Sequence, residues 1–512
     1  MVDGRENLTV YNFNLLLGFE PNGVDVAQAH RLKMFRKLGV ETYFVFTHWP
    51  NSEQLDYFLS KGYRYNELLF AQLLFTDQLV TEPILSSSEM EMLLGLEKSQ
   101  QIDSSDESQS YKLDNGEVIV FRYSKYYLDK VQYVDYFSEG YLLRREMYST
   151  RKLVTDYFVL NYQNNQISAE LGKRVYHNQD GSVALEEISQ KEKRLYLLKD
   201  NRLITHEELI TFFINKLNLK ERDIVLMDRA SNIDFARPLL EQSSGAKLGL
   251  VFHSEHTFGE HPFSYEYYYP VKYANRFDFM ITSTKLQAEI LKESFQKEGQ
   301  QAPEIYTIPV GSLNSLQYAD KVRQPQKIMT ASRLIYSKRV DLAIRAVVLA
   351  HQKGANIDFS IFGQGMEYNG LKELICEYSA EDYIHLKGYA RLDDEYIKHS
   401  IYLTASTTET FGLTLMEAVG AGLAIVGFDV RYGNPNFILD GKNGYLVPFE
   451  GRSDQELVED MAQILVELSS KDMEDFHSNS YQLARDYLEE RILELWNCFL
   501  GEQSSRATIS KI

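Results

Sequence analysis

The sequence contains little cysteine and fewer basic than acidic residues. Its 512 residues include two cysteines, Cys376 and Cys498, too few for a disulfide framework or a cysteine-based zinc site. The 54 basic and 73 acidic side chains give a formal net charge of −19. Contacts with nucleic-acid phosphates need a basic face, so this charge argues against a nucleic-acid-binding protein. Any anionic ligand must be held by a local cluster of basic groups.

The sequence also lacks a long apolar segment. The apolar run at residues 15–17 is far shorter than the ~20 residues that span a bilayer. No basic stretch followed by a long apolar core begins the sequence, as a secretion signal would. We therefore expect a cytoplasmic protein, and peripheral association with the inner face of the cell membrane stays open.

Two regions of the sequence alternate between strand and helix patterns. The first begins with a predicted strand (8–17), a loop (18–23), an amphipathic helix (24–38) and a second strand (40–47), as a Rossmann-like domain does. The second begins after residue 312, and right-handed crossovers between its strands give a parallel sheet. The predicted domains are an N-terminal Rossmann-like domain (1–62 and 200–312), a β-rich insertion for acceptor or partner binding (63–199), a C-terminal Rossmann-like domain (313–471), helices packing back across the cleft (472–500) and a disordered tail (501–512).

The insertion carries the pattern of an antiparallel sheet. Short aromatic-rich runs at 118–123, 131–137 and 153–162 predict strands, and Asp-Asn-Gly at 114–116 predicts a tight turn. The segment 99–110 is polar and acidic, and we expect it to be a mobile loop.

Two carboxylates lie on either side of a predicted strand-to-helix junction. The strand 401–406 leads into a threonine-rich turn, which puts Glu409 in the loop and Glu417 in the helix that follows. Ligands bind at the carboxyl ends of parallel strands, where the free N–H groups of a helix start attract phosphate. We expect both carboxylates to face one crevice. Taken alone, Glu417 would be an exposed helical glutamate or a local ion-pair partner.

Arg333 and Lys338 lie at the end of the first strand of the second region and at the start of the next helix. Positive groups at such positions can bind the phosphates of an anionic ligand. Arg333 can bind phosphate as a fork and Lys338 as a point charge. The alternative is a solvated pair at a helix start. No Asp-Xaa-Asp triplet occurs, so a metal bridge to such phosphates is not expected.

Several motifs resemble the retaining glycosyltransferases of the GT-B architecture. Those of the second region are Thr330–Leu334 followed by Lys338, Phe362–Gly365, Lys387–Tyr389, and the pair Glu409 and Glu417. Segments of the first region resemble a narrower family, the accessory-secretion-system O-glycosyltransferases (GtfA type) that initiate glycosylation of serine-rich-repeat adhesins. These segments are Tyr11–Asn14, Gly23–Ala29, His253–His256 and Ile308–Leu313. The insertion matches this family too, whereas 19–22 departs from its smaller, serine-rich loop and leaves the sugar and acceptor preference open.

The resemblance implies an α/β fold of the GT-B kind, with two Rossmann-like domains facing a cleft and the β-rich insertion in the N-terminal domain. It also implies a UDP-sugar as donor substrate, with no metal and no other cofactor. The residues with a catalytic role by resemblance are His253, Glu409, Arg333 and Lys338. Those that bind substrate or nucleotide are Gly18, Gly23, His256, Gly363, Gly365, Gly388, Tyr389, Thr410, Phe411, Gly412, Leu413 and Glu417. Simpler alternatives are a hydrogen-bonded strand-end histidine for His253 and a plain turn for Gly363 and Gly365.

The function implied by the resemblance is the transfer of N-acetylglucosamine from UDP-GlcNAc to Ser or Thr hydroxyls of a serine-rich-repeat adhesin, with retention at the anomeric carbon. Two alternatives keep the fold: the same O-glycosylation with UDP-glucose, and a wall teichoic acid (polyol-phosphate) glycosyltransferase. A third is a non-enzymatic subunit, although the chain retains both basic residues and both carboxylates. The expected partners are the adhesin acceptor and a related, non-catalytic glycosyltransferase-like stabilising subunit that docks on the insertion to form a hetero-oligomer.

Overall fold

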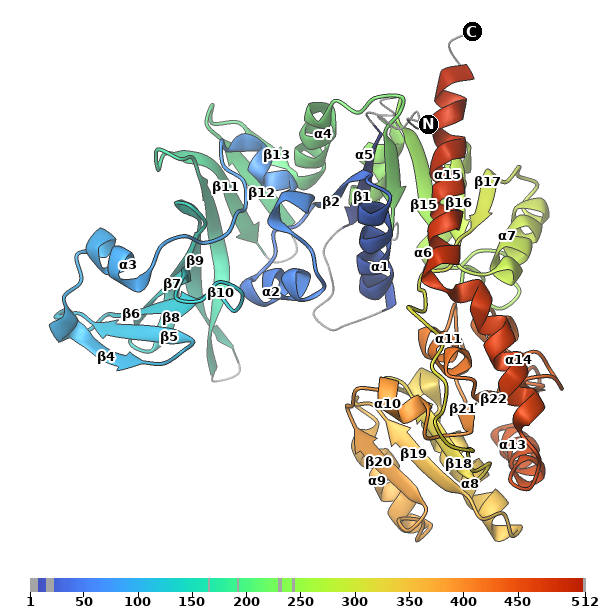
Figure 1. Cartoon of the computed structure of the whole chain (residues 1–512). Helices are drawn as coiled ribbons and strands as arrows, with labels where there is room; N and C mark the ends of the chain where they lie inside the picture. Colours follow the sequence, from blue (N-terminus) through green and yellow to red (C-terminus); the bar gives the residue numbers. More distant parts are fainter. Residues whose placement is uncertain are drawn as a thin grey trace. The chain divides into compact units, whose positions relative to one another are not determined.

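The structure is a computed structural model that describes residues 8–14, 23–163, 166–190, 193–228, 233–241 and 245–509. The chain divides into two compact units, whose elements are labelled in Figure 1. The N-terminal unit comprises the described residues of Glu6–Asp25 and Val40–Leu248, and the C-terminal unit comprises Val26–Gly39 and the chain from Gly249 onward. All of the predicted site residues except Gly18 and Gly23 belong to the C-terminal unit.

The N-terminal unit contains a parallel sheet, in which β1 pairs with β14 and β2, and β2 pairs with β3. Its strands are β1 (Thr9–Asn14), β2 (Glu41–Phe46), β3 (Leu68–Phe70) and β14 (Ile224–Met227). All four residues of β14 are buried, as expected for a parallel strand covered on both faces. Of the predicted strand 8–17, the structure describes residues 8–14, in which β1 spans Thr9–Asn14, and residues 15–17 lie outside the described part. β3 lies within the predicted insertion (63–199) but belongs to this parallel sheet.

The same unit contains a ten-stranded antiparallel sheet, which follows the chain order from β4 to β13. Its strands are β4 (Gln101–Ser104), β5 (Ser108–Lys112), β6 (Val118–Tyr123), β7 (Val131–Ser138), β8 (Tyr141–Tyr148), β9 (Lys152–Gln163), β10 (Gln166–His177), β11 (Val183–Gln190), β12 (Lys193–Leu198) and β13 (Leu203–Thr205). The predicted mobile loop 99–110 is wrong, because it contains β4 and the start of β5. β4 is an edge strand whose side chains are all exposed, so its polar residues need no apolar partners.

The two sheets of this unit meet at a buried polar junction near helix α4 (His206–Leu217). The ring of His48, which follows β2, lies 4.5 Å from the ring of His206, measured between centroids. Nδ1 of His206 lies 2.9 Å from the hydroxyl oxygen of Tyr196 on β12. Burial lowers the pKa of His48 to about 3 and that of His206 to about 4. Both imidazoles are therefore neutral near pH 7.

The C-terminal unit begins with three strands, in which β16 pairs in parallel with β15 and with β17. They are β15 (Lys247–Val251), whose last three residues belong to this unit, β16 (Phe279–Thr282) and β17 (Glu304–Thr307). Helices of this part are α1 (Gly23–Lys37), α6 (Tyr265–Lys272) and α7 (Lys285–Lys297).

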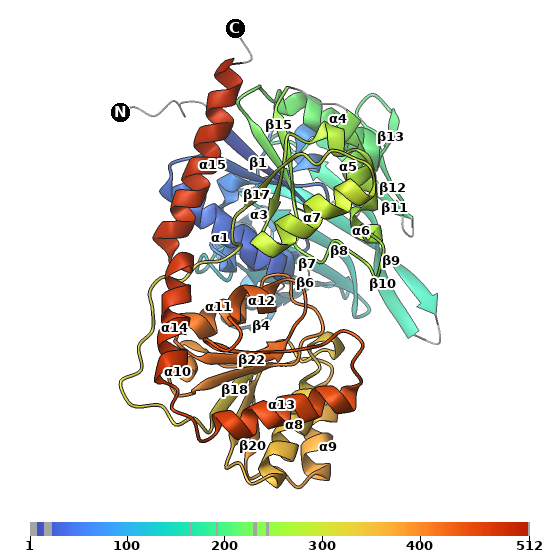
Figure 2. The same ribbon diagram turned by 90° about the vertical axis from the view of Figure 1, so that its right-hand side faces the viewer.

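A six-stranded parallel sheet follows, in the order β20-β19-β18-β21-β22-β23. Its strands are β18 (Lys327–Ala331), β19 (Asp358–Phe362), β20 (Ile384–Gly388), β21 (Ile401–Thr404), β22 (Ala424–Phe428) and β23 (Gly444–Val447). Successive side chains of the strands point to opposite faces of the sheet and enter two apolar layers. Ile328 and Ile401 pack with helices α8, α9 and α13, whereas Met329 and Tyr402 pack with α11. Figure 2 shows these helices on the two faces of the sheet. These helices are α8 (Val340–Gln352), α9 (Tyr368–Glu377), α11 (Leu413–Gly420) and α13 (Asp454–Leu468).

The chain passes twice between the two sheets of the C-terminal unit, and the two passages are hydrogen-bonded to each other. The N–H of Leu313 donates to the carbonyl of Tyr487 at 2.8 Å, and the N–H of Glu489 donates to the carbonyl of Leu313 at 2.9 Å. Helix α14 (Glu474–Ala484) precedes the second passage and α15 (Glu489–Ile509) follows it. The predicted disordered tail is wrong for residues 501–509, which continue α15, and residues 510–512 lie outside the described part.

Helix α15 completes an aromatic core against elements from the first half of the C-terminal unit. The ring of Trp496 lies edge-on to that of Phe35 on α1, with centroids 5.0 Å apart. One turn further along, Phe499 contacts Phe279 of β16 at 4.9 Å. Rings in this geometry gain electrostatic as well as apolar stabilisation.

Candidate active site

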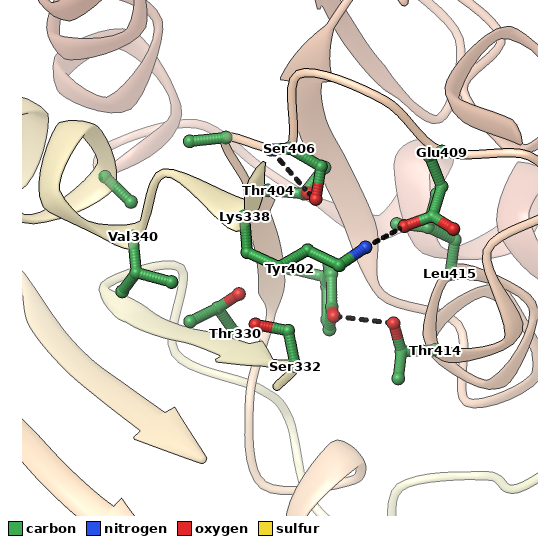
Figure 3. A pocket seen from close by; sticks show the side chains of 12 residues that line it. Thr330, Ser332, Lys338, Val340, Tyr402, Thr404, Ser406, Glu409, Thr414 and Leu415 are labelled. Carbon is green, nitrogen blue, oxygen red and sulfur yellow. Dashed lines mark hydrogen bonds and ion pairs between the residues drawn. The ribbon is translucent and has the colours of Figure 1, made fainter. Parts of the chain in front are cut away.

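A small polar pocket lies at the carboxyl ends of β18 and β21, the neighbouring strands at which the strand order reverses. Ligands of open α/β sheets bind at such a reversal. The pocket is lined by Thr330, Ser332, Lys338, Val340, Ala343, Tyr402, Thr404, Ala405, Ser406, Glu409, Thr414 and Leu415. Figure 3 shows that the Lys338 ammonium points across this pocket toward Glu409.

The Lys338 ammonium and the Glu409 carboxylate form an ion pair, with Nζ 2.5 Å from Oε2. Both side chains are 19% exposed, so solvent screens the pair only in part. Two hydrogen bonds to one backbone carbonyl bring the two residues together. The carbonyl of Ser337 accepts from the N–H of Thr407 at 3.0 Å and from the hydroxyl of Thr407 at 3.3 Å. The loop after β18 is thereby tied to the loop after β21.

Tyr402 connects the floor of the pocket to the start of helix α11. Its hydroxyl donates to the carbonyl of Ala331 at 2.7 Å and accepts from the N–H of the same residue at 3.2 Å. The hydroxyl oxygen also lies 2.9 Å from Oγ1 of Thr414. Burial raises the pKa of Tyr402, so the phenol stays protonated. The sequence signal for this residue is a lone phenol in the otherwise apolar run of β21, and our sequence reasoning missed it.

Glu417 lies in the second turn of α11. Its Oε2 accepts from the hydroxyl of Tyr396 at 2.8 Å. Burial raises the pKa of the Glu417 carboxyl, and the hydrogen bond from Tyr396 opposes that shift. Glu417 does not line the pocket that contains Glu409. That both carboxylates face one crevice stays a prediction.

Arg333 is exposed directly after β18, and its carbonyl accepts from the N–H of Ile335 at 3.0 Å. Within the described ranges its guanidinium has no hydrogen bond or ion pair. A charged fork with no protein partner is suited to binding an anion.

The glycine-rich turn after β19 has a structural reason for its glycines. A Cβ on Gly363 would lie 1.9 Å from the carbonyl oxygen of Ser332, and one on Gly365 would lie 2.2 Å from that of Leu334. The φ angles of the two glycines are +135° and +156°, which disfavour other residues. The turn thus lies against the backbone that carries Arg333, and ligand approach at these glycines stays a prediction.

The other predicted residues of this region have mixed surroundings. Gly388 ends β20 with φ +68°, and the side chain of Tyr389 beside it is 83% exposed. Thr410 is half-buried, while Phe411 is a core residue whose ring lies 5.2 Å from that of Phe437. Gly412 caps α11 in the left-handed conformation, and Leu413 is its first residue.

The two predicted histidines lie in different surroundings. His253 lines a second small cavity together with His30, Arg31 and Trp496, and its N–H donates to the hydroxyl of Tyr267 at 3.2 Å. His256 is fully buried and lines neither cavity. Of the remaining predicted residues, Gly23 is the exposed first residue of α1, and Gly18 lies outside the described residues.

Two protein families match segments of the chain. The family described as "Glycosyl transferases group 1" matches residues 317–483, and that described as "GtfA extended beta-sheet domain" matches residues 101–200. The chain is 35% identical to the "UDP-N-acetylglucosamine--peptide N-acetylglucosaminyltransferase GtfA subunit" of Streptococcus parasanguinis, over 97% of this chain and 99% of the relative.

Two solved structures of similar proteins cover 97% of the chain. One is the pneumococcal O-GlcNAc transferase GtfA in complex with UDP and GlcNAc, at 33% identity and a TM-score of 0.84, with 99% of that protein covered. The other is a GtfA/B complex, at 34% identity and a TM-score of 0.86, with 100% of the matched chain covered.

The parallel sheets, the site at the strand-order reversal and these matches define a glycosyltransferase of the GT-B fold, which confirms the predicted fold class. The similarity extends over nearly the whole of both chains, and the protein belongs to the GtfA family of glycosyltransferases. In the part of the chain that the structure describes, no helix is both long enough and apolar enough to span a membrane.

Proposed function

We propose that this protein transfers N-acetylglucosamine from UDP-GlcNAc to Ser or Thr hydroxyls of a serine-rich-repeat adhesin, with retention at the anomeric carbon. The observation that carries the proposal is the 35% identity, over 97% of the chain, to a peptide N-acetylglucosaminyltransferase. In the reaction, the bond from the anomeric carbon to the diphosphate breaks and a bond to the acceptor oxygen forms.

Lys338 and Arg333 stabilise the departing diphosphate in this proposal. The leaving oxygen gains negative charge as the bond breaks, and cations held in place beforehand lower the barrier. The ion pair with Glu409 holds the Lys338 ammonium at the edge of the pocket, and the exposed Arg333 offers a second cation after the same strand. No metal is needed in this scheme, which the absence of an Asp-Xaa-Asp triplet from the sequence supports.

The carboxylates and His253 have separate roles in the proposal. Glu409 lies near the transferred sugar, where it binds a hydroxyl or stabilises positive charge. Glu417 binds the ribose hydroxyls of the nucleotide, since a diol donates well to a charged acceptor. His253 approaches the sugar from the β15 side. The support for these roles is their place in the family motifs and, for Glu409, its contact with Lys338.

We also propose that the ten-stranded sheet binds a related glycosyltransferase-like subunit. Apolar side chains at the end of the β9–β10 hairpin favour this: Tyr162 is 66% exposed and its cross-strand partner Ile167 is 44% exposed. Exposed apolar groups of this kind mark interaction surfaces. Replacing both by Asp is expected to prevent co-elution with the co-expressed subunit while donor hydrolysis continues. Unchanged co-elution would refute this surface.

The test of the proposed activity is transfer of labelled sugar by the purified protein. UDP-GlcNAc or UDP-glucose is incubated with a serine-rich-repeat peptide or with a polyol-phosphate polymer, with and without EDTA. We expect label on the peptide from UDP-GlcNAc, no effect of EDTA, and an α linkage by NMR. Label on the polymer alone would overturn the proposal in favour of a teichoic acid glycosyltransferase, and label from UDP-glucose alone would correct the sugar.

A further inference from the structure

A buried contact joins the segment after β22, which carries Tyr432, to the segment that follows β15. The hydroxyl of Tyr432 lies 3.0 Å from Nδ1 of His256, and the two rings are stacked at 5.5 Å with an interplanar angle of 7°. The side chains of both residues are fully buried. They come from sequence positions 176 residues apart, so the contact links the two sheets of the C-terminal unit.

Tyr432 also holds the backbone of Glu409. The N–H of Tyr432 donates to the carbonyl of Glu409 at 2.6 Å, and the N–H of Gly433 donates to the same carbonyl at 2.6 Å. In the other direction, the N–H of Glu409 donates to the carbonyl of Arg431 at 3.2 Å. A Cβ on Gly433 would lie 2.3 Å from the carbonyl oxygen of Phe411, so the backbone at Gly433 lies directly against the loop that carries Glu409.

His256 is itself fixed by its own segment. Its carbonyl accepts from the N–H of Ser264 at 2.6 Å, and its ring lies edge-on to Phe252 at 5.8 Å. Burial lowers its pKa to about 4, and a hydrogen bond to the backbone of Ile290 opposes that shift. The neutral ring has one N–H; placed on Nε2, it faces the hydroxyl oxygen of Ser294 at 3.5 Å, and Nδ1 then accepts from the Tyr432 hydroxyl.

We infer that His256 and Tyr432 are a positioning pair for Glu409. Their hydrogen bond anchors the strand-like contact between Tyr432 and Glu409 to the opposite sheet, and that contact sets where the Glu409 carboxylate meets Lys338. His256 therefore acts through Tyr432 rather than on the substrate. The inference rests on the proposed function, because it assumes that the Lys338 and Glu409 pair serves donor chemistry.

The test compares Tyr432→Phe, which removes one hydroxyl and keeps the stacked ring, with His256→Asn, which keeps an acceptor near the position of Nδ1. One neutral hydrogen bond is worth about a three- to tenfold change. We expect Tyr432→Phe to lower kcat for donor hydrolysis about three- to tenfold with the donor KM changed less than twofold. His256→Asn should retain most of kcat, whereas His256→Leu should match Tyr432→Phe, and the double variant should lose no more than either.

The matched control is Tyr445→Phe on β23, because the hydroxyl of Tyr445 donates to Glu467 at 3.2 Å, away from the pocket. It should leave kcat unchanged. Wild-type kcat in Tyr432→Phe would overturn the inference, and so would a loss of kcat that is fully accounted for by unfolding of the variant at the assay temperature.

A second measurement separates this inference from the proposed function. If the wild-type protein does not hydrolyse UDP-GlcNAc, the proposed function fails, and hydrogen exchange still tests the pair. Peptides that contain the amides of Glu409, Tyr432 and Gly433 should exchange faster in Tyr432→Phe than in the wild type. Equal exchange would refute the positioning role whatever the substrate is.

Discussion

The ion pair between Lys338 and Glu409 makes a quantitative prediction about donor turnover. The two changes are Lys338→Met and Glu409→Gln, which remove each charge while keeping the length of the side chain. If the pair acts as one unit, each single change should remove most of the rate acceleration that the two residues provide together. If the two residues act separately, the losses should multiply.

The expected size follows from the contact. Nζ and Oε2 are 2.5 Å apart, and each side chain is 19% exposed. A charge-assisted hydrogen bond in such a setting contributes about 1.5 to 3 kcal/mol. A value of about 2 kcal/mol corresponds to roughly a thirtyfold change in rate, since each 1.36 kcal/mol is tenfold. Independent effects would therefore give about a 900-fold loss in the double variant, whereas a coupled pair gives about 30- to 100-fold.

The assay is the kcat/KM for UDP-GlcNAc hydrolysis in the wild type, the two single variants and the double variant. The control is Lys353→Met, because Lys353 is exposed at the end of α8 and does not line the pocket. The control should stay within about twofold of the wild type, as surface substitutions usually do. A double variant whose loss equals the product of the two single losses would refute the coupling, and wild-type turnover in Lys338→Met would remove the lysine from the reaction altogether.

Two further predictions concern stability. Gly363→Ala should lower the free energy of unfolding by at least about 2 kcal/mol, because its Cβ would lie 1.9 Å from a carbonyl oxygen. The control Gly370→Ala, whose Cβ would have nothing within 4 Å, should change the free energy of unfolding by less than about 1 kcal/mol. Equal urea midpoints for the two variants would contradict this prediction. Acid should destabilise the N-terminal unit, since His48 and His206, with pKa values of about 3 and about 4, stay neutral in the fold while the unfolded chain gains protons below pH 6.5. The contribution of the two histidines to the free energy of unfolding is thus fully present above pH 6.5, and it falls toward pH 4 by up to about 1.4 kcal/mol per pH unit for each histidine. Urea titrations at pH 7 and pH 5 measure this fall. A His206→Gln variant that is as acid-sensitive as the wild type would refute the prediction.

Much of the second α/β region could be predicted from the sequence, because buried parallel strands are short apolar runs. The strand expected at 401–406 is present as β21, which ends at Thr404. β23 was not predicted, since its four residues follow directly on a turn and give no pattern of their own. The predicted loop 99–110 failed for the opposite reason, because an edge strand is held by backbone hydrogen bonds that leave no trace in side-chain composition.

The site could be predicted only as far as motifs reach. The sequence indicated that Lys338 follows one strand and Glu409 another, and the structure brings the two side chains together. The hydrogen bond from Tyr396 to Glu417 could not be predicted, because Tyr396 comes from a different helix. The contact of His256 with Tyr432 had no local signal at all, since it spans 176 residues.

The aromatic core that α15 shares with α1 ties the beginning of the chain to its end. Phe35 leaves the ribosome among the first residues, and its partner Trp496 among the last. At a synthesis rate of roughly 5 to 20 residues per second, about 20 to 90 s separate the two. During that time the apolar face of α1 has no native cover from α15. The native contacts between α1 and α15 therefore form only after Trp496 has been synthesised, and truncation before Trp496 would leave the apolar face of α1 without this cover.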